Sequence, residues 1–120
     1  MDELSVEQFM RAPASQSVRL IDFEDARVVE RAGTYFLVVS GTKPYLNMTV
    51  RLSPLIYVRQ PEYWGIEVLG SLPGIALPAT APYTVAISLS GILGTIGIEV
   101  IGASSSQKID VLGEAENPEE

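Results

Sequence analysis

The chain has 120 residues, 47% apolar and 19% charged, which suits one folded domain with its own core. It holds no cysteine and no histidine, which excludes disulfides, thiol nucleophiles, histidine-based triads and the usual zinc or haem ligands, so we expect no metal and no cofactor. The net charge of −7 comes from the chain ends, since seven basic residues stand against eight acidic ones between Ser17 and Gly113. No basic cluster exists there to bind nucleic acid.

Residues 1–16 are predicted to form one short helix followed by a small-residue linker. Ser5 and Gln8 have the spacing of a capping box, Leu4 and Phe9 that of a hydrophobic staple, and Pro13 prevents continuation. A helix this short is marginal alone and has to dock on something. The stretch lacks the basic and apolar regions of a secretory signal, so the expected location is the cytoplasm.

Residues 17–113 form the predicted β domain, because the period of the apolar pattern there changes to two. Turn signals separate the segments at intervals typical of a sandwich or barrel, and no helical pattern lies between them. We therefore predict an all-β, antiparallel sandwich or barrel-like fold of about seven to nine strands, followed by an acidic flexible tail at 114–120. The expected strands are 18–23, 27–31, 34–41, 46–52, 55–60, 64–70, 83–91, 95–103 and 107–113.

The segment 70–82 (GSLPGIALPATAP) is the most specific functional lead. It is uncharged, apolar and interrupted by three prolines, and long loops of this kind tend to be functional. Its candidate interface residues are Leu72, Ile75, Leu77 and Pro78. One reading makes it an interface with a protein partner or a second copy, and the other folds it back to cap the core. Prolines and glycines also exclude a membrane helix from the uncharged stretch 68–98.

A second candidate site is the group YVRQPEYW, which carries Tyr57, Arg59, Tyr63 and Trp64. Exposed aromatic rings can stack on a sugar or another small ligand while their OH and NH groups hydrogen-bond to it. Alternatively, Trp64 is the core aromatic of the sandwich. Because Tyr63 and Trp64 are adjacent, they should point to opposite faces if both lie in one strand.

Two similar hexapeptides, GIEVLG at 65–70 and GIEVIG at 97–102, each carry one carboxylate. Glu67 and Glu99 could act as the acid and base of a hydrolase if they converged in a cleft. Alternation instead predicts two strands with Ile and Val facing the core and each Glu facing solvent. The acids Asp22, Glu24 and Asp25 lack the regular spacing of a calcium loop.

The sequence therefore favours a non-catalytic interaction protein over an enzyme. We expect it to self-associate or to dock a protein partner through residues 70–82, without nucleic acid or membrane as partners. Binding of a carbohydrate or small ligand at the aromatic group is the alternative, and a carboxylate-pair hydrolase using Glu67 and Glu99 comes third.

Overall fold

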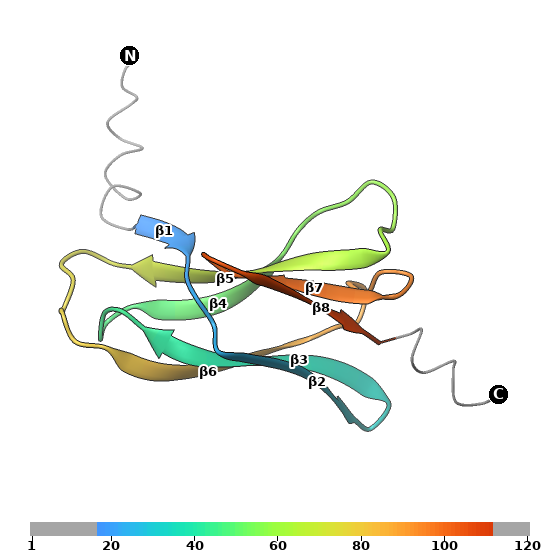
Figure 1. The fold of residues 1–120 in the computed structure, drawn as a ribbon, viewed down its shortest axis with the longest axis horizontal. Helices are drawn as coiled ribbons and strands as arrows, with labels where there is room; N and C mark the ends of the chain where they lie inside the picture. The colour runs from blue at the N-terminus through green and yellow to red at the C-terminus, as the bar shows by residue number, and fades with distance from the viewer. Residues whose placement is uncertain (1–16, 112–120) are drawn as a thin grey trace, which may run out of the picture.

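Eight strands form from the alternating segments, and they lie in two packed layers (Figure 1). The structure is a computed structural model that describes residues 17–111, so the predicted N-terminal helix and the acidic tail lie outside the described residues. The predicted all-β, sandwich-like architecture is confirmed. The strands are β1 (Ser17–Leu20), β2 (Asp25–Arg31), β3 (Thr34–Lys43), β4 (Thr49–Pro54), β5 (Tyr63–Leu72), β6 (Ala81–Ser88), β7 (Gly97–Ile101) and β8 (Ser106–Asp110).

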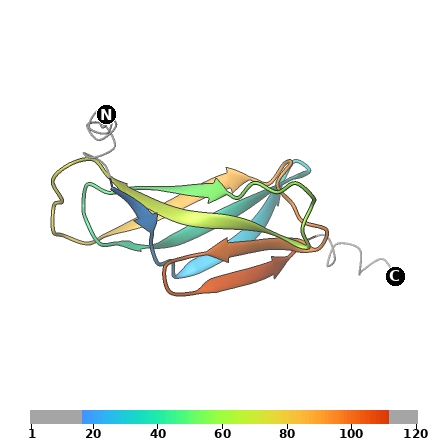
Figure 2. The same ribbon diagram turned by 90° about the horizontal axis from the view of Figure 1, so that it is seen from above.

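The larger sheet is organised around β5, its longest strand. One edge of β5 pairs with β4, and the other edge pairs with β7 through residues 63–67 and with β1 through residues 69–72. β8 follows β7 at the edge of this sheet. The smaller sheet has the order β2-β3-β6. Seen from above, the strands of the two layers cross obliquely (Figure 2), as in sandwiches built from twisted sheets.

The pairing of β5 with β7 is parallel, whereas all other strand pairs among the described residues are antiparallel. The two similar hexapeptides therefore lie side by side, staggered by two residues, so that Gly65 is opposite Glu99 and Glu67 is opposite Ile101. A parallel pair needs a crossover connection. Here β6 supplies it by passing through the other sheet between β5 and β7.

The core lies between the two sheets and is filled by the inward residues of each strand. Their alternation is regular: in β5 and β7 the aliphatic residues on either side of Glu67 and Glu99 are fully buried. Removing such side chains from water is the main favourable term in folding. The fully buried side chains are Leu37, Val39, Ile66, Val68, Leu89, Ile98 and Val100.

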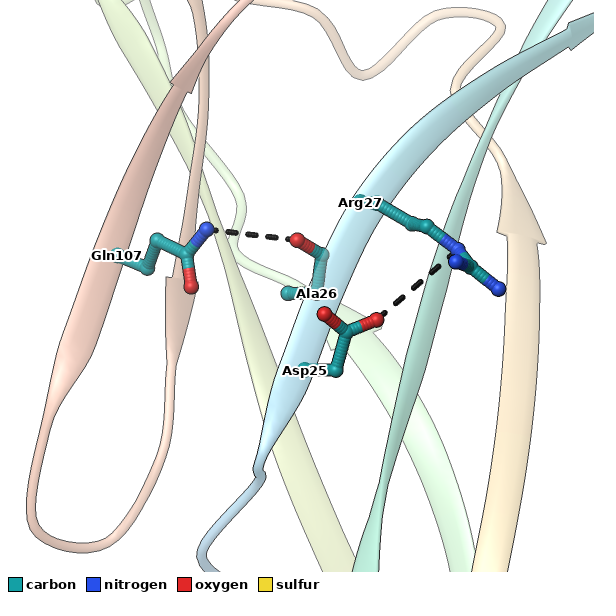
Figure 3. A network of polar contacts seen from close by, with 4 residues as sticks. All are labelled: Asp25, Ala26, Arg27 and Gln107. Carbon is teal, nitrogen blue, oxygen red and sulfur yellow. Dashed lines mark hydrogen bonds and ion pairs between the residues drawn. The ribbon is translucent and has the colours of Figure 1, made fainter.

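Three local features join the layers and close the strands. Ala32 and Gly33 turn the chain between β2 and β3 with φ of 53° and 83°, values typical of a two-residue hairpin turn. The Tyr83 hydroxyl donates a hydrogen bond to the Asp22 carbonyl at 2.7 Å, where the chain crosses from β1 to β2. On the other side, the Gln107 side-chain amide donates to the Ala26 carbonyl at 3.3 Å and links edge strands β8 and β2 (Figure 3).

The strand predicted at 55–60 is wrong, because this segment is a loop between β4 and β5. Its β-branched and aromatic composition resembles a strand, but Ile56 and Val58 are 96% and 104% exposed. Pro54 ends β4, since proline has no N–H to continue a ladder. The strand expected at 18–23 also stops early, at Leu20, where the chain leaves the larger sheet.

Within residues 17–111 no helix has the length and apolar character required to cross a membrane.

Candidate functional site

The predicted loop 70–82 is shorter in the structure, because β5 continues to Leu72 and β6 begins at Ala81. The irregular part is residues 73–80, at the end of the sandwich where β1 begins (Figure 1). Leu72 packs against the core, whereas Ile75 is 84% exposed, Leu77 is 46% exposed and Pro78 is also exposed. Residues 73–80 therefore present apolar side chains to solvent.

The turn between β3 and β4 adds a third apolar side chain to this surface. Alternation along the strand expected at 46–52 would turn both Leu46 and Met48 toward the core, but Leu46 is 51% exposed, and its backbone N–H donates to the Leu77 carbonyl at 3.0 Å. The predicted inward position is correct for Met48, which is buried. Strand alternation begins only at Thr49, so Leu46 lies in a turn where the period of two does not apply. We call Leu46, Ile75 and Leu77 the apolar tip.

The amide of Asn47 links the two loops of the apolar tip by two hydrogen bonds. Its Nδ2 donates to the Ile75 carbonyl at 2.8 Å, and its Oδ1 accepts from the Leu77 N–H at 3.0 Å. A further bond from the Ala79 N–H to the Leu77 carbonyl, at 2.7 Å, closes a tight turn around Pro78. These bonds pair backbone N–H and C=O groups that in a mobile loop would hydrogen-bond to water. The tip is thus preorganised, which lowers the ordering cost of binding.

Two cations lie near the apolar tip. The Arg19 guanidinium lies 5.7 Å from the centre of the Tyr45 ring, and Lys43 Nζ donates to the Met48 carbonyl at 2.8 Å. Both line a cavity of about 430 Å³ that also reaches Asp22, Pro44 and Thr80. Asp22 Oδ1 is occupied there by the N–H and the hydroxyl of Ser104, at 3.1 and 2.7 Å.

The aromatic group is divided by the fold. Tyr57 and Trp64 pack edge to face with ring centres 5.1 Å apart, and their polar atoms are used internally: Trp64 Nε1 donates to the Leu55 carbonyl at 2.9 Å, and the Tyr57 hydroxyl accepts from the Gly65 N–H at 3.1 Å. Tyr57 and Trp64 are half-buried. Their rings and polar groups are therefore directed to the protein itself.

Tyr63 lies apart from this pair. Both Tyr63 and Trp64 lie in β5, so they point to opposite faces, as expected for neighbours in a strand. The Tyr63 hydroxyl donates to Asp110 at 2.6 Å, and Lys108 Nζ lies 4.9 Å from its ring centre. The hydrogen bond to Asp110 raises the pKa of Tyr63. Arg59 is exposed in the loop before β5.

Glu67 and Glu99 lie on the outer face of the larger sheet, because their neighbours on each strand fill the core. The stagger places them diagonally rather than opposite each other. Glu99 is paired across the ladder with Lys108, and Glu67 with Ser53. An opposite-charge neighbour of this kind stabilises a sheet. Four cavities among residues 17–111 are all lined by other residues.

No group of three acidic, histidine or cysteine side chains gathers among residues 17–111. Each of the three acids in the β1–β2 connection contacts a different partner, so their carboxylates do not converge on one point. Asp22 binds Ser104, Glu24 accepts from the Thr42 hydroxyl at 3.0 Å, and Asp25 lies 3.9 Å from Arg27. This segment is a polar crossing between the sheets.

Sequence reasoning missed Leu46 and Asn47 as parts of the tip, and Ile56 and Val58 as exposed apolar residues of the β4–β5 loop. This loop lies at the opposite end of the sandwich (Figure 1). Both pairs follow a proline, at positions 44 and 54. Pro61 precedes Tyr63, the first residue of β5, by the same spacing, so a proline alone does not distinguish these turns from strands.

No known protein family matches the chain, and neither a curated protein nor a solved structure is similar to it.

Proposed function

We propose that the chain is a non-catalytic interaction protein that self-associates or docks a protein partner through the apolar tip. The observation that carries the proposal is the combination of exposure and order at residues 73–80. Ile75 is 84% exposed although hydrogen bonds from Asn47 fix the backbone on either side of Ala76. Apolar side chains that are displayed on an ordered loop fit a binding surface better than a cap on the core.

The size of the tip sets the strength of this contact. At about 25 cal/mol per Å² of buried apolar area, covering three partly exposed aliphatic side chains yields a few kcal/mol. Association itself costs on the order of several kcal/mol. The tip alone therefore supports a transient contact, and a lasting one has to include the neighbouring surface around Arg19 and Lys43. The cations favour a partner surface that carries carboxylates beside its apolar residues.

Sedimentation equilibrium of the full chain at rising concentration tests self-association. We expect the average mass of the wild type to rise with concentration and that of Ile75→Ser/Leu77→Ser to stay at the monomer value. Ile56→Ser/Val58→Ser is the matched control, because it removes two exposed apolar side chains at the other end. A mass that falls equally in both double variants would contradict a role for the tip.

Ligand binding at the aromatic group remains the second candidate. The internal bonds of Tyr57 and Trp64 favour it less, because a ligand would have to compete for the same polar atoms. Tryptophan fluorescence tests it directly, since Trp64 is the single tryptophan of the chain. Emission that shifts on addition of sugars would support this candidate. The cytoplasmic location stays a prediction.

A further inference from the structure

The outer face of the smaller sheet carries an apolar surface that the described residues leave uncovered. The strand registers place Val29 beside Phe36, and Val38 beside Ala86. These four residues and Arg31 line a shallow cavity of about 330 Å³. Leu37 and Val39, which alternate with them on β3, point into the core and are fully buried. We call Val29, Phe36, Val38 and Ala86 the outer apolar face.

The sequence of β3 indicates that this face should be covered. Its run TYFLVVSG is almost continuously apolar, a pattern typical of a strand with packing on both sides. In the structure only the inner side of β3 meets another sheet. Phe36 and Val38 are half-buried and are not among the residues that pack against the core. Among residues 17–111, therefore, nothing packs on the outer side of β3, although its sequence is suited to packing on both sides.

The border of the outer apolar face is basic along β2. Arg27 and Arg31 alternate with Val29, so all three share the face. The only acid of β2 on this face is Asp25, whose Oδ2 lies 3.9 Å from Arg27 Nε, with both side chains more than half exposed (Figure 3). An exposed pair at this distance contributes little. Arg31 thus leaves one positive charge beside the apolar residues.

We propose that the N-terminal segment of the chain, residues 1–16, docks on the outer apolar face. In the helix that the sequence predicts there, Val6, Phe9 and Met10 follow at i, i+3 and i+4 and share one side. Glu7 lies within that helix, and Asp2 and Glu3 precede it, against the single base Arg11. The segment therefore combines an apolar side with a negative charge. The apolar side of the segment is complementary to the outer apolar face, and its negative charge is complementary to the basic border along β2.

The length of the connection is compatible with this docking. Residues 11–16 separate the predicted helix from Ser17, and six residues span at most about 20 Å. Val38, at the near end of the face, lies five residues from the end of β3, about 17 Å along the strand, in the layer about 10 Å from that of β1. The connection therefore favours the face of a second copy over the face of its own chain. A helix of under two turns is unstable by itself, and docking supplies the packing that stabilises it.

Amide NMR spectra of the full chain test this proposal. We expect Phe9→Ser to shift the amide signals of Val29, Phe36, Val38 and Ala86, while strands of the larger sheet keep theirs. Gln8→Glu, which keeps the capping box with Ser5 and lies on the polar side of the predicted helix, is the matched control and should leave these signals in place. Shifts confined to residues next to Ser17, or equal shifts in both variants, would overturn the proposal.

A charge exchange tests the basic border separately. Arg31→Glu should reproduce the shifts of Phe9→Ser, and Glu7→Arg in the same chain should reverse them. Arg51→Glu serves as the control, because Arg51 is an exposed arginine on β4 of the other sheet. Shifts that do not depend on protein concentration identify docking within one chain, and concentration-dependent shifts identify a second copy. Arg31→Glu without effect on the face would contradict the proposed contact.

Discussion

Asn47 Oδ1 accepts a hydrogen bond from the backbone N–H of Leu77 at 3.0 Å, which ties two loops that lie 30 residues apart. Because the Nδ2 of the same amide donates to the Ile75 carbonyl, one side chain fixes the backbone on either side of Ala76. The side chains of Ile75 and Leu77 remain directed to solvent as a result. The proposed binding through the apolar tip depends on this arrangement.

Replacing Asn47 should loosen the apolar tip without unfolding the sandwich. Asn47→Ala removes both bonds, so we expect a loss of about 1 kcal/mol in the free energy of unfolding and faster hydrogen exchange at residues 75–79. Asn47→Asp keeps the acceptor for Leu77 and should have a smaller effect. Exchange rates that are unchanged in Asn47→Ala would show that prolines alone hold the loop.

The cross-strand pair of Glu99 and Lys108 should respond to charge exchange. Glu99→Lys places two cations opposite each other in the β7–β8 ladder, and we expect a loss of about 0.5 kcal/mol. Lys108→Glu in the same chain restores opposite charges and should recover most of it. Denaturant unfolding of the two single variants and the double variant measures the coupling. Additive losses would show that the two side chains do not interact.

The hairpin turn at Ala32 offers a stabilising substitution. Ala32 has a φ of 53°, which costs a residue with a Cβ about 1 kcal/mol. Asparagine tolerates this region and is preferred before glycine in such turns, so Ala32→Asn should raise the free energy of unfolding by about 0.5 kcal/mol. Thermal unfolding measures it. A lower melting temperature in Ala32→Asn would contradict the turn geometry.

Stability should fall at alkaline pH because of Tyr83. Burial raises the pKa of Tyr83 to about 12 from its ordinary 10.0, so the fold favours the protonated phenol. The stabilisation is complete below pH 10.0 and is lost as pH rises toward 12, a change of about 2 kcal/mol. Tyr83→Phe lacks this titration, so its unfolding free energy should converge with that of the wild type over this range.

Tyr63 titrates in the same direction, because its hydrogen bond to Asp110 also raises its pKa. Both proteins in the Tyr83 comparison therefore carry Tyr63→Phe, which removes that contribution from the difference. Parallel stability curves between pH 10 and 12 would contradict the predicted role of the Tyr83 hydroxyl.

The sequence was sufficient to predict features that depend on neighbouring residues. The strands expected at 34–41 and 83–91 correspond to β3 and β6, and the turn expected between 27–31 and 34–41 is the turn at Ala32 and Gly33. Each is fixed by the period of side chains along one strand or by the φ angles of two residues.

The remaining features depend on contacts between distant segments. Parallel pairing of β5 with β7 is a choice among strand orders that no local pattern encodes. The loop at 73–80 lies between the pair of Leu72 with Ser17 and the pair of Ala81 with Lys43, and the turn that holds Leu46 is bonded to Leu77. The candidate site could therefore be placed in its segment, but not with all its residues.

The proposed function requires that the apolar tip contacts another protein. A photoreactive side chain placed at position 75 of the full chain tests it most directly, in purified protein and in cell extract, with position 58 as the matched exposed control at the other end. We predict a covalent adduct with a second copy or with one defined protein from position 75, lost on Leu77→Ser and absent from position 58. No protein adduct from position 75, or equal labelling from both positions, would contradict the claim.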